Sequence, residues 1–138
     1  MQTPSRFILI DDEMYSNKIS KTFIRKMYPG AEVLDFLSPL QALHYIENEY
    51  KECSLSTAIL LDINMPELNG WQVLEKLQEL PSLIKNCLSV YILSSSIDPK
   101  DKQKADEHPL VEGYIEKPLS REILSQLFGG REINGDSV

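Results

Sequence analysis

Short apolar runs that alternate with longer amphipathic segments constrain the fold of this chain more than any other feature. Four such runs occupy residues 7–10, 33–36, 58–61 and 90–93, and a weaker fifth surrounds Tyr114 and Ile115. Apolar runs of this length, bounded by polar residues, are typical of buried strands. The sequence therefore predicts five strands spread along the whole chain.

The segments between the runs carry helix signals. In the first segment, apolar residues recur at the helical period, at Tyr15, Ile19, Phe23 and Met27. Ser38 and Asp98 each precede a proline, the combination that favours an N-cap followed by the first helical position. Ser120 is a third candidate cap before a short final helix. Five helices are therefore expected, one after each strand.

This alternation predicts an α/β fold with a doubly wound parallel sheet, because successive parallel strands need helical crossovers that cover both faces. Central strands of such a sheet are apolar on both faces, whereas edge strands tolerate polar residues. The second run contains Asp35 and the fifth is short and flanked by Glu116, so both are placed at edges. The expected architecture is flavodoxin-like, with five parallel strands in the order 2-1-3-4-5.

Length and charge restrict the function. A chain of 138 residues has room for one domain, expected over residues 1–128 with a flexible polar tail at 129–138. A net charge of -7 opposes binding to nucleic acid. No apolar run approaches the roughly 20 residues of a membrane span, so a cytoplasmic protein without membrane contact is expected. Cys53 and Cys87 form no metal-binding motif and are expected to be buried thiols.

Polar residues that could bind metal ions or take part in catalysis follow four of the five strands. Asp11 and Asp12 follow the first run, Asp62 follows the third, Ser94 follows the fourth and Lys117 follows the fifth. In open α/β sheets, the carboxyl ends of parallel strands meet at one edge, where ligands bind. We therefore expect these side chains to gather at a single site.

The composition of this set indicates phosphoryl chemistry with a metal ion. Crowded carboxylates repel one another unless a cation lies among them, and oxygen ligands without His or Cys suit Mg²⁺. A carboxylate beside a metal and a lysine can attack phosphorus, and Asp62 is the central candidate. Taken singly, Asp11 and Asp12 could only cap a helix, Asp62 could begin a turn, and Lys117 could be a solvated charge. Their occurrence at separate strand ends favours a common site.

The ordered set resembles the receiver domain of response regulators, the phospho-acceptor module of two-component phosphorelay signalling. The resemblance rests on four features: Asp11-Asp12-Glu13 after the first strand, the segment 60–66 with Gly70 after it, Leu93-Ser94, and Tyr114 placed three residues before Lys117-Pro118. Together these features span the chain up to about Phe128. A stand-alone receiver domain is the expectation that follows.

The resemblance implies that Asp62 is the phospho-acceptor. It would take a phosphoryl group from a phosphohistidine of a partner histidine kinase or histidine phosphotransfer protein. Mg²⁺ would be held by Asp12, Asp62 and the backbone carbonyl of Asn64, with Asp11 acting mainly through water. The only enzymatic activity implied is self-catalysed phosphoryl transfer with slow autodephosphorylation.

The resemblance also assigns roles at the last two strand ends. Ser94 and Lys117 would each bind a phosphoryl oxygen, and the Lys117-Pro118 bond would be cis. Tyr114 falls on the aromatic switch position, where its ring would turn inward as Ser94 is drawn to the phosphate. The signal would then pass to a downstream protein partner through a changed binding face.

Two other classes of function remain as alternatives. A magnesium-dependent phosphatase of the haloacid dehalogenase type also forms an acyl phosphate on an aspartate, but it needs a second acid two residues later, where this chain has Asn64. The other alternative is a protein-interaction module that works without phosphorylation. The complete set of acids, hydroxyl and lysine favours the receiver over both.

Overall fold

Five parallel strands form one sheet in the order β2-β1-β3-β4-β5, as the sequence predicted. The structure is a computed structural model, and it describes residues 3–49 and 55–129. The strands are β1 (Arg6–Ile10), β2 (Glu32–Phe36), β3 (Thr57–Leu61), β4 (Leu88–Ser94) and β5 (Val111–Glu116). The flavodoxin-like prediction is therefore confirmed, with β2 and β5 at the two edges.

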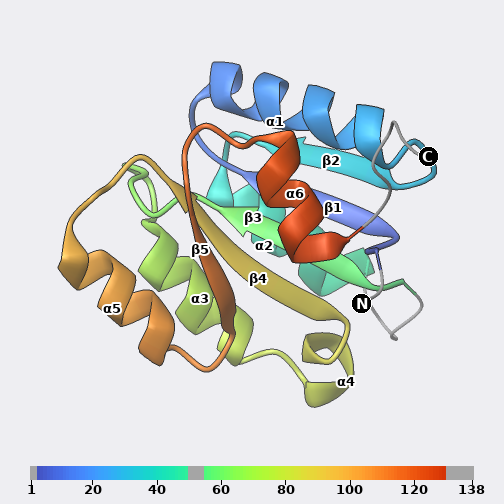
Figure 1. Ribbon diagram of the computed structural model, residues 1–138. Coiled ribbons are helices and arrows are strands. Elements are labelled where there is room, and N and C mark those ends of the chain that lie inside the picture. Colours follow the sequence, from blue (N-terminus) through green and yellow to red (C-terminus); the bar gives the residue numbers. More distant parts are fainter. Residues whose placement is uncertain (1–2, 50–54, 130–138) are drawn as a thin grey trace.

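Helices cover both faces of the sheet (Figure 1). The helices that match the five predicted ones are α1 (Met14–Met27), α2 (Pro39–Glu49), α3 (Gly70–Gln78), α5 (Pro99–Glu107) and α6 (Arg121–Phe128). A four-residue helix, α4 (Ser82–Lys85), is additional. Helices α1 and α6 lie on one face, and α2, α3 and α5 lie on the other.

The interior strand β1 contributes to two core layers, one on each face of the sheet. Phe7 and Leu9 pack with the residues of α1 and α6, whereas Ile8 and Ile10 pack with those of α2 and α3. Successive residues of a strand point to opposite faces of the sheet. Because helices cover both faces, all four side chains are buried. Burial on both faces fixes the register of β1 between its two neighbours, and so fixes where Asp11 and Asp12 leave the sheet.

Local capping explains where the helices begin. The side chains of Asp98 and Ser120 accept backbone N–H groups at the starts of α5 and α6, and Ser38 does the same before α2, as predicted. Helix α3 begins with a reciprocal capping box between Asn69 and Gln72. Such pairs satisfy N–H groups that have no partner within the helix.

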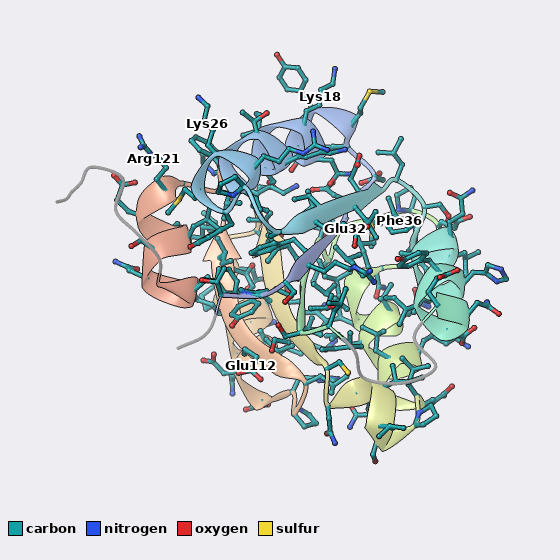
Figure 2. All side chains as sticks on the ribbon, turned by 90° about the vertical axis from the view of Figure 1, so that its right-hand side faces the viewer. Lys18, Lys26, Glu32, Phe36, Glu112 and Arg121 are labelled. Atoms are coloured by element: carbon teal, nitrogen blue, oxygen red, sulfur yellow. The ribbon has the colours of Figure 1, made fainter. Side chains whose placement is uncertain are left out.

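The buried face of helix α1 matches its apolar period only in part, since Met27 is buried and Phe23 is half-buried but Tyr15 and Ile19 are not. Asn17, Ser20 and Ile24 are buried, whereas Tyr15 is 78% exposed and Ile19 is 40% exposed. The buried Asn17 amide donates to the carbonyls of Asp11 and Phe36, so a polar side chain ties the helix to the strand ends. In Figure 2, Lys18 and Lys26 point from α1 away from the sheet.

Three further expectations have different outcomes. Cys87 is disulfide-bonded, so the expectation of a free thiol at this position is wrong. Cys53 and residues 130–138 of the expected tail lie outside the described residues. Among the helices that the structure describes, none is long and apolar enough to cross a membrane.

Gly70 lets the start of α3 approach the loop that carries Asp62. A Cβ atom at this position would lie 2.7 Å from the Asp62 carbonyl oxygen and 2.7 Å from the Ile63 Cα atom. Both are backbone atoms, which cannot give way as a flexible side chain could. By contrast, Gly30 has no atom within 4 Å of an added Cβ.

We therefore expect Gly70→Ala to lower the free energy of unfolding by about 1 to 3 kcal/mol, the usual effect of overpacking. Urea unfolding followed by circular dichroism measures this difference. Gly30→Ala is the matched control and is expected to change the stability by less than about 0.5 kcal/mol. Equal effects of the two substitutions would show that the close approach at Gly70 does not constrain the fold.

Candidate functional site

Three carboxylates meet at the carboxyl edge of the sheet. Asp11, Asp12 and Asp62 each offer an oxygen atom, and these oxygens lie within 4.8 Å of one another. Asp11 and Asp12 follow β1 directly and Asp62 follows β3, which is paired with β1 in register. The predicted gathering of these residues is therefore present in the structure.

Backbone contacts hold the carboxylates in place. The Asp62 N–H donates to the Ile10 carbonyl over 2.9 Å, which continues the pairing of the two strands by one residue. The Asn64 N–H donates to Asp62 Oδ1 over 3.2 Å, and the Glu13 N–H donates to Asp11 Oδ1 over 2.9 Å. Asp62 is buried and only 5% exposed, and Asp12 is exposed at the mouth of the site.

Lys117 supplies the positive charge of the site. Its Nζ atom lies 2.7 Å from an Asp11 oxygen and 3.6 Å from an Asp62 oxygen. The Lys117 N–H donates to the Ser94 carbonyl over 2.9 Å, and the following bond to Pro118 is cis, as expected. The lysine is thus fixed by β4 and directed to the ends of β1 and β3.

The charges in the site perturb the pKa of two of these groups. Burial, then the charge of Asp11, raises the pKa of Asp62 from 3.8 to about 6, although Lys117 and the Asn64 N–H act in the opposite direction. Burial alone lowers the pKa of Lys117, but the carboxylates of Asp11, Asp62 and Glu13 outweigh it and raise this pKa above its usual value of 10.5. One lysine therefore only partly offsets the acids around it.

The donor set fits a hard divalent cation. Its candidate ligands are carboxylate oxygens, and Mg²⁺ prefers oxygen ligands and usually keeps several waters. A bound cation would also relieve the repulsion that raises the pKa of Asp62. Asn64 is exposed beside Asp62, and its predicted role through the backbone carbonyl stays a prediction.

Ser94 and Tyr114 lie on neighbouring strands beside this cluster. Ser94 is fully buried at the end of β4, and its Oγ atom accepts the Ser96 N–H over 3.1 Å. Tyr114 on β5 is half-buried, and its hydroxyl donates to the Ser96 carbonyl over 2.9 Å. Both side chains are therefore linked to the loop that follows β4.

Two residues that were not predicted from the sequence, Glu13 and Ser96, contact the predicted site residues. A Glu13 carboxylate oxygen lies 3.6 Å from Lys117 Nζ, and the adjacent acids of the first strand end were the available signal for it. Ser96 contacts both Ser94 and Tyr114, but the sequence of three consecutive serines did not indicate that the third would make these contacts.

A groove opens next to Lys117. It has a volume of about 470 Å³ and is lined mainly by the first two turns of α1 and by residues 117–119. Met14 is 59% exposed and lies beside Tyr15 and Ile19 in this lining. Exposed apolar side chains that cluster in this way are typical of protein-binding surfaces.

Comparison with known proteins identifies the family. The family model for the response regulator receiver domain matches residues 7–128. A two-component response regulator from Cytophaga hutchinsonii is 32% identical, with a TM-score of 0.82 over 92% of this chain and 96% of its own. The chain therefore belongs to the response regulator receiver domain family.

Two further relatives extend the comparison. The phosphorylated cyanobacterial phytochrome response regulator RcpA is 26% identical, with a TM-score of 0.69 over 91% of this chain and 89% of its own. The sensor histidine kinase CheAY of Helicobacter pylori is 28% identical over 125 residues, which are 89% of this chain and 15% of the kinase. The chain spans only 12%, 17% and 28% of the first three curated relatives.

The raised pKa of Asp62 predicts a pH-dependent stability. Because its pKa is about 6 in the folded protein against an ordinary 3.8, Asp62 destabilises the metal-free fold progressively as the pH rises through this interval. Asp62→Asn removes the charge and is expected to raise the free energy of unfolding at neutral pH by about 1 to 3 kcal/mol. Urea unfolding in chelator over a range of pH measures the gap between the two proteins. A gap that does not change with pH would contradict this account.

Proposed function

We propose that this receiver domain accepts a phosphoryl group on Asp62, with Mg²⁺, from a phosphohistidine of a partner protein. The single observation that carries the proposal is the cluster itself: a buried carboxylate lies within 3.6 Å of a lysine and is grouped with two further acids. Membership in the receiver family supports a role in two-component signalling. A cytoplasmic location is part of the proposal, since the donor proteins of such relays act on that side.

Each residue has a distinct task in the transfer. An oxygen of Asp62 attacks phosphorus, the phosphorus–nitrogen bond breaks, and the imidazole of the donor leaves. The Lys117 ammonium group pairs with a phosphoryl oxygen, which weakens its ion pair with Asp11. The Ser94 hydroxyl donates to another phosphoryl oxygen. Mg²⁺ bound by Asp12 and Asp62 would supply the charge that brings an anionic phosphoryl group to an acidic site.

The surroundings of the site favour a protein as the donor. The groove beside Lys117 carries exposed apolar side chains, including Met14 and Tyr15, which a small phosphodonor would not need. The same helix carries Lys18 and Lys26 on its exposed side in a chain whose net charge is -7. An acidic or mixed protein surface that presents a phosphohistidine fits this helix best.

We propose that the output face of the domain is formed by α5, β5 and α6, and that α5 is the element that responds. Ala105 is the only residue of α5 that is buried, so this helix has little apolar area to hold it in place. Tyr114 lies on the adjacent strand and is bonded to the loop that leads from Ser94 to α5. A small movement of Ser94 can therefore bias a weakly held element and change the face that a downstream partner binds.

The phosphatase alternative is less well supported. It needs a proton donor two residues after the nucleophile, and Asn64 cannot serve as a general acid. The non-phosphorylated interaction module would leave the burial and raised pKa of Asp62 without a use.

Incubation with Mg²⁺ and acetyl phosphate is expected to add one phosphoryl group to the protein, seen by intact mass. Asp62 is the proposed acceptor because its buried carboxylate lies beside Lys117 and the other two acids, so Asp62→Asn should abolish the added mass. Asp106→Asn, which changes an exposed acid of α5, is the matched control and should be labelled like wild type. Labelling of the Asp62 variant, or labelling in excess chelator, would contradict the assignment of the acceptor or the metal.

Phosphorylation is also expected to change amide hydrogen exchange in residues 98–109 and around Tyr114 more than in α2. The reason is the small buried area of α5, which makes local opening easy to shift. Hydrogen exchange is measured by mass spectrometry with and without the phosphoryl group. The change in residues 98–109 and around Tyr114 is then compared with the change in α2 of the same protein. Changes confined to α2 would move the output surface elsewhere.

A further inference from the structure

All the hydrogen-bonding groups of Ser96 are engaged, each with a different residue. Its N–H donates to Ser94 Oγ over 3.1 Å, and its carbonyl accepts the Tyr114 hydroxyl over 2.9 Å. Its hydroxyl donates to Asp101 Oδ2 over 2.6 Å and accepts the Asp98 N–H over 3.3 Å. Ser96 therefore joins the end of β4, strand β5 and the first turn of α5.

The contacts of the hydroxyl form an unusual helix cap. Asp98 is the N-cap of α5, and Asp101 is its third helical residue. In a capping box, the side chain at this third position accepts the N-cap N–H directly. Here the Ser96 hydroxyl lies between the two, because it accepts the Asp98 N–H and donates to the Asp101 carboxylate. The cap of α5 is thus completed by a residue that precedes the helix and also contacts Ser94.

The cap matters because, apart from backbone bonds to the Asp98 carbonyl and an exposed Lys102–Glu116 ion pair of 4.0 Å, few contacts fix this end of α5. Ala105, the buried residue of the helix, lies in its second half. Lys104 contacts the Trp71 ring, with Nζ 4.8 Å from its centroid, and this contact also lies beyond the first turn. The first turn depends on the side chain of Asp98, which accepts the Lys100 N–H, and on the bridge through Ser96.

We infer that Ser96 is a positioning residue that couples the Ser94 hydroxyl to the N-terminal cap of α5. When Ser94 Oγ turns to a phosphoryl oxygen, the Ser96 N–H loses its acceptor, the bridge to Asp101 shifts, and the first turn of α5 loosens. The inference rests on the proposed function for its trigger. The bridge itself exists without phosphorylation and can be tested separately.

Amide exchange at residues 100–102 in the unphosphorylated protein tests the bridge. Ser96→Ala and Asp101→Ala are each expected to raise exchange about fivefold, the factor that corresponds to one net hydrogen bond. In a protein that already carries Asp101→Ala, the further substitution Ser96→Ala should raise the exchange rate much less than it does alone. Ser95→Ala, at the exposed neighbouring serine, is the matched control and should leave exchange unchanged. Independent, multiplying effects, or a Ser96 variant that matches the control, would overturn the bridge.

A second comparison tests the coupling without any phosphoryl group. Ser94→Ala removes the acceptor of the Ser96 N–H, so it should raise exchange at residues 100–102 in wild type and much less in the Ser96→Ala background. An equal rise in both backgrounds would show that the signal runs through Tyr114 instead and would overturn the coupling.

A third comparison adds Mg²⁺ and acetyl phosphate, with intact mass recorded in parallel. Wild type should gain mass and exchange faster at residues 100–102, whereas Ser96→Ala should gain the same mass with a smaller change in exchange. A gain in mass with equal changes in both proteins would overturn the inference. Absence of any gain in mass would instead refute the proposed function, and the two preceding comparisons would still decide the bridge and the coupling.

Discussion

The ion pairs of Lys117 are the interaction on which the rest of this structure depends. One ammonium group lies 2.7 Å from Asp11 and 3.6 Å from Asp62, so it joins the ends of β1, β3 and β5. Its backbone is in turn bonded to Ser94 at the end of β4. Without this charge, the buried carboxylates of Asp11 and Asp62 would repel each other with no positive side chain between them. With it, oxygens of Asp11, Asp12 and Asp62 lie within 4.8 Å of one another.

The same arrangement connects the site to the surface. In the proposed transfer, a phosphoryl group would compete with Asp11 for Lys117 and with the Ser96 N–H for Ser94, so its arrival would change contacts on two strands at once. Helix α5 is held by little apolar burial, since Ala105 is its single buried residue, and the proposed output therefore lies there. In this proposal, the low local stability of α5 couples phosphoryl binding to signal output without a large movement of the sheet.

The sheet order, and the gathering of the acids and the lysine at one edge of the sheet, could be predicted from the sequence because both depend on local patterns. Strands β1, β3 and β4 are unbroken apolar runs in the sequence. The acids and the serine stand at the ends of these strands, and the lysine follows β5. The sequence did not indicate the polar part of the buried face of α1, because Asn17 is buried through hydrogen bonds to two carbonyls and a hydropathy pattern does not predict such contacts. It also did not indicate the bridge at Ser96, which depends on a loop conformation that three identical residues do not reveal.

A crystal structure of the protein with Mg²⁺ and beryllium trifluoride, which imitates a phosphoryl group, tests the central claim most directly. The account predicts that the beryllium atom is bound to an oxygen of Asp62, with one fluorine near Lys117 Nζ and another near Ser94 Oγ. It also predicts that Mg²⁺ contacts Asp12 and Asp62. Beryllium bound to Asp11 or Asp12, or a complex formed without contact to Lys117 and Ser94, would contradict the account.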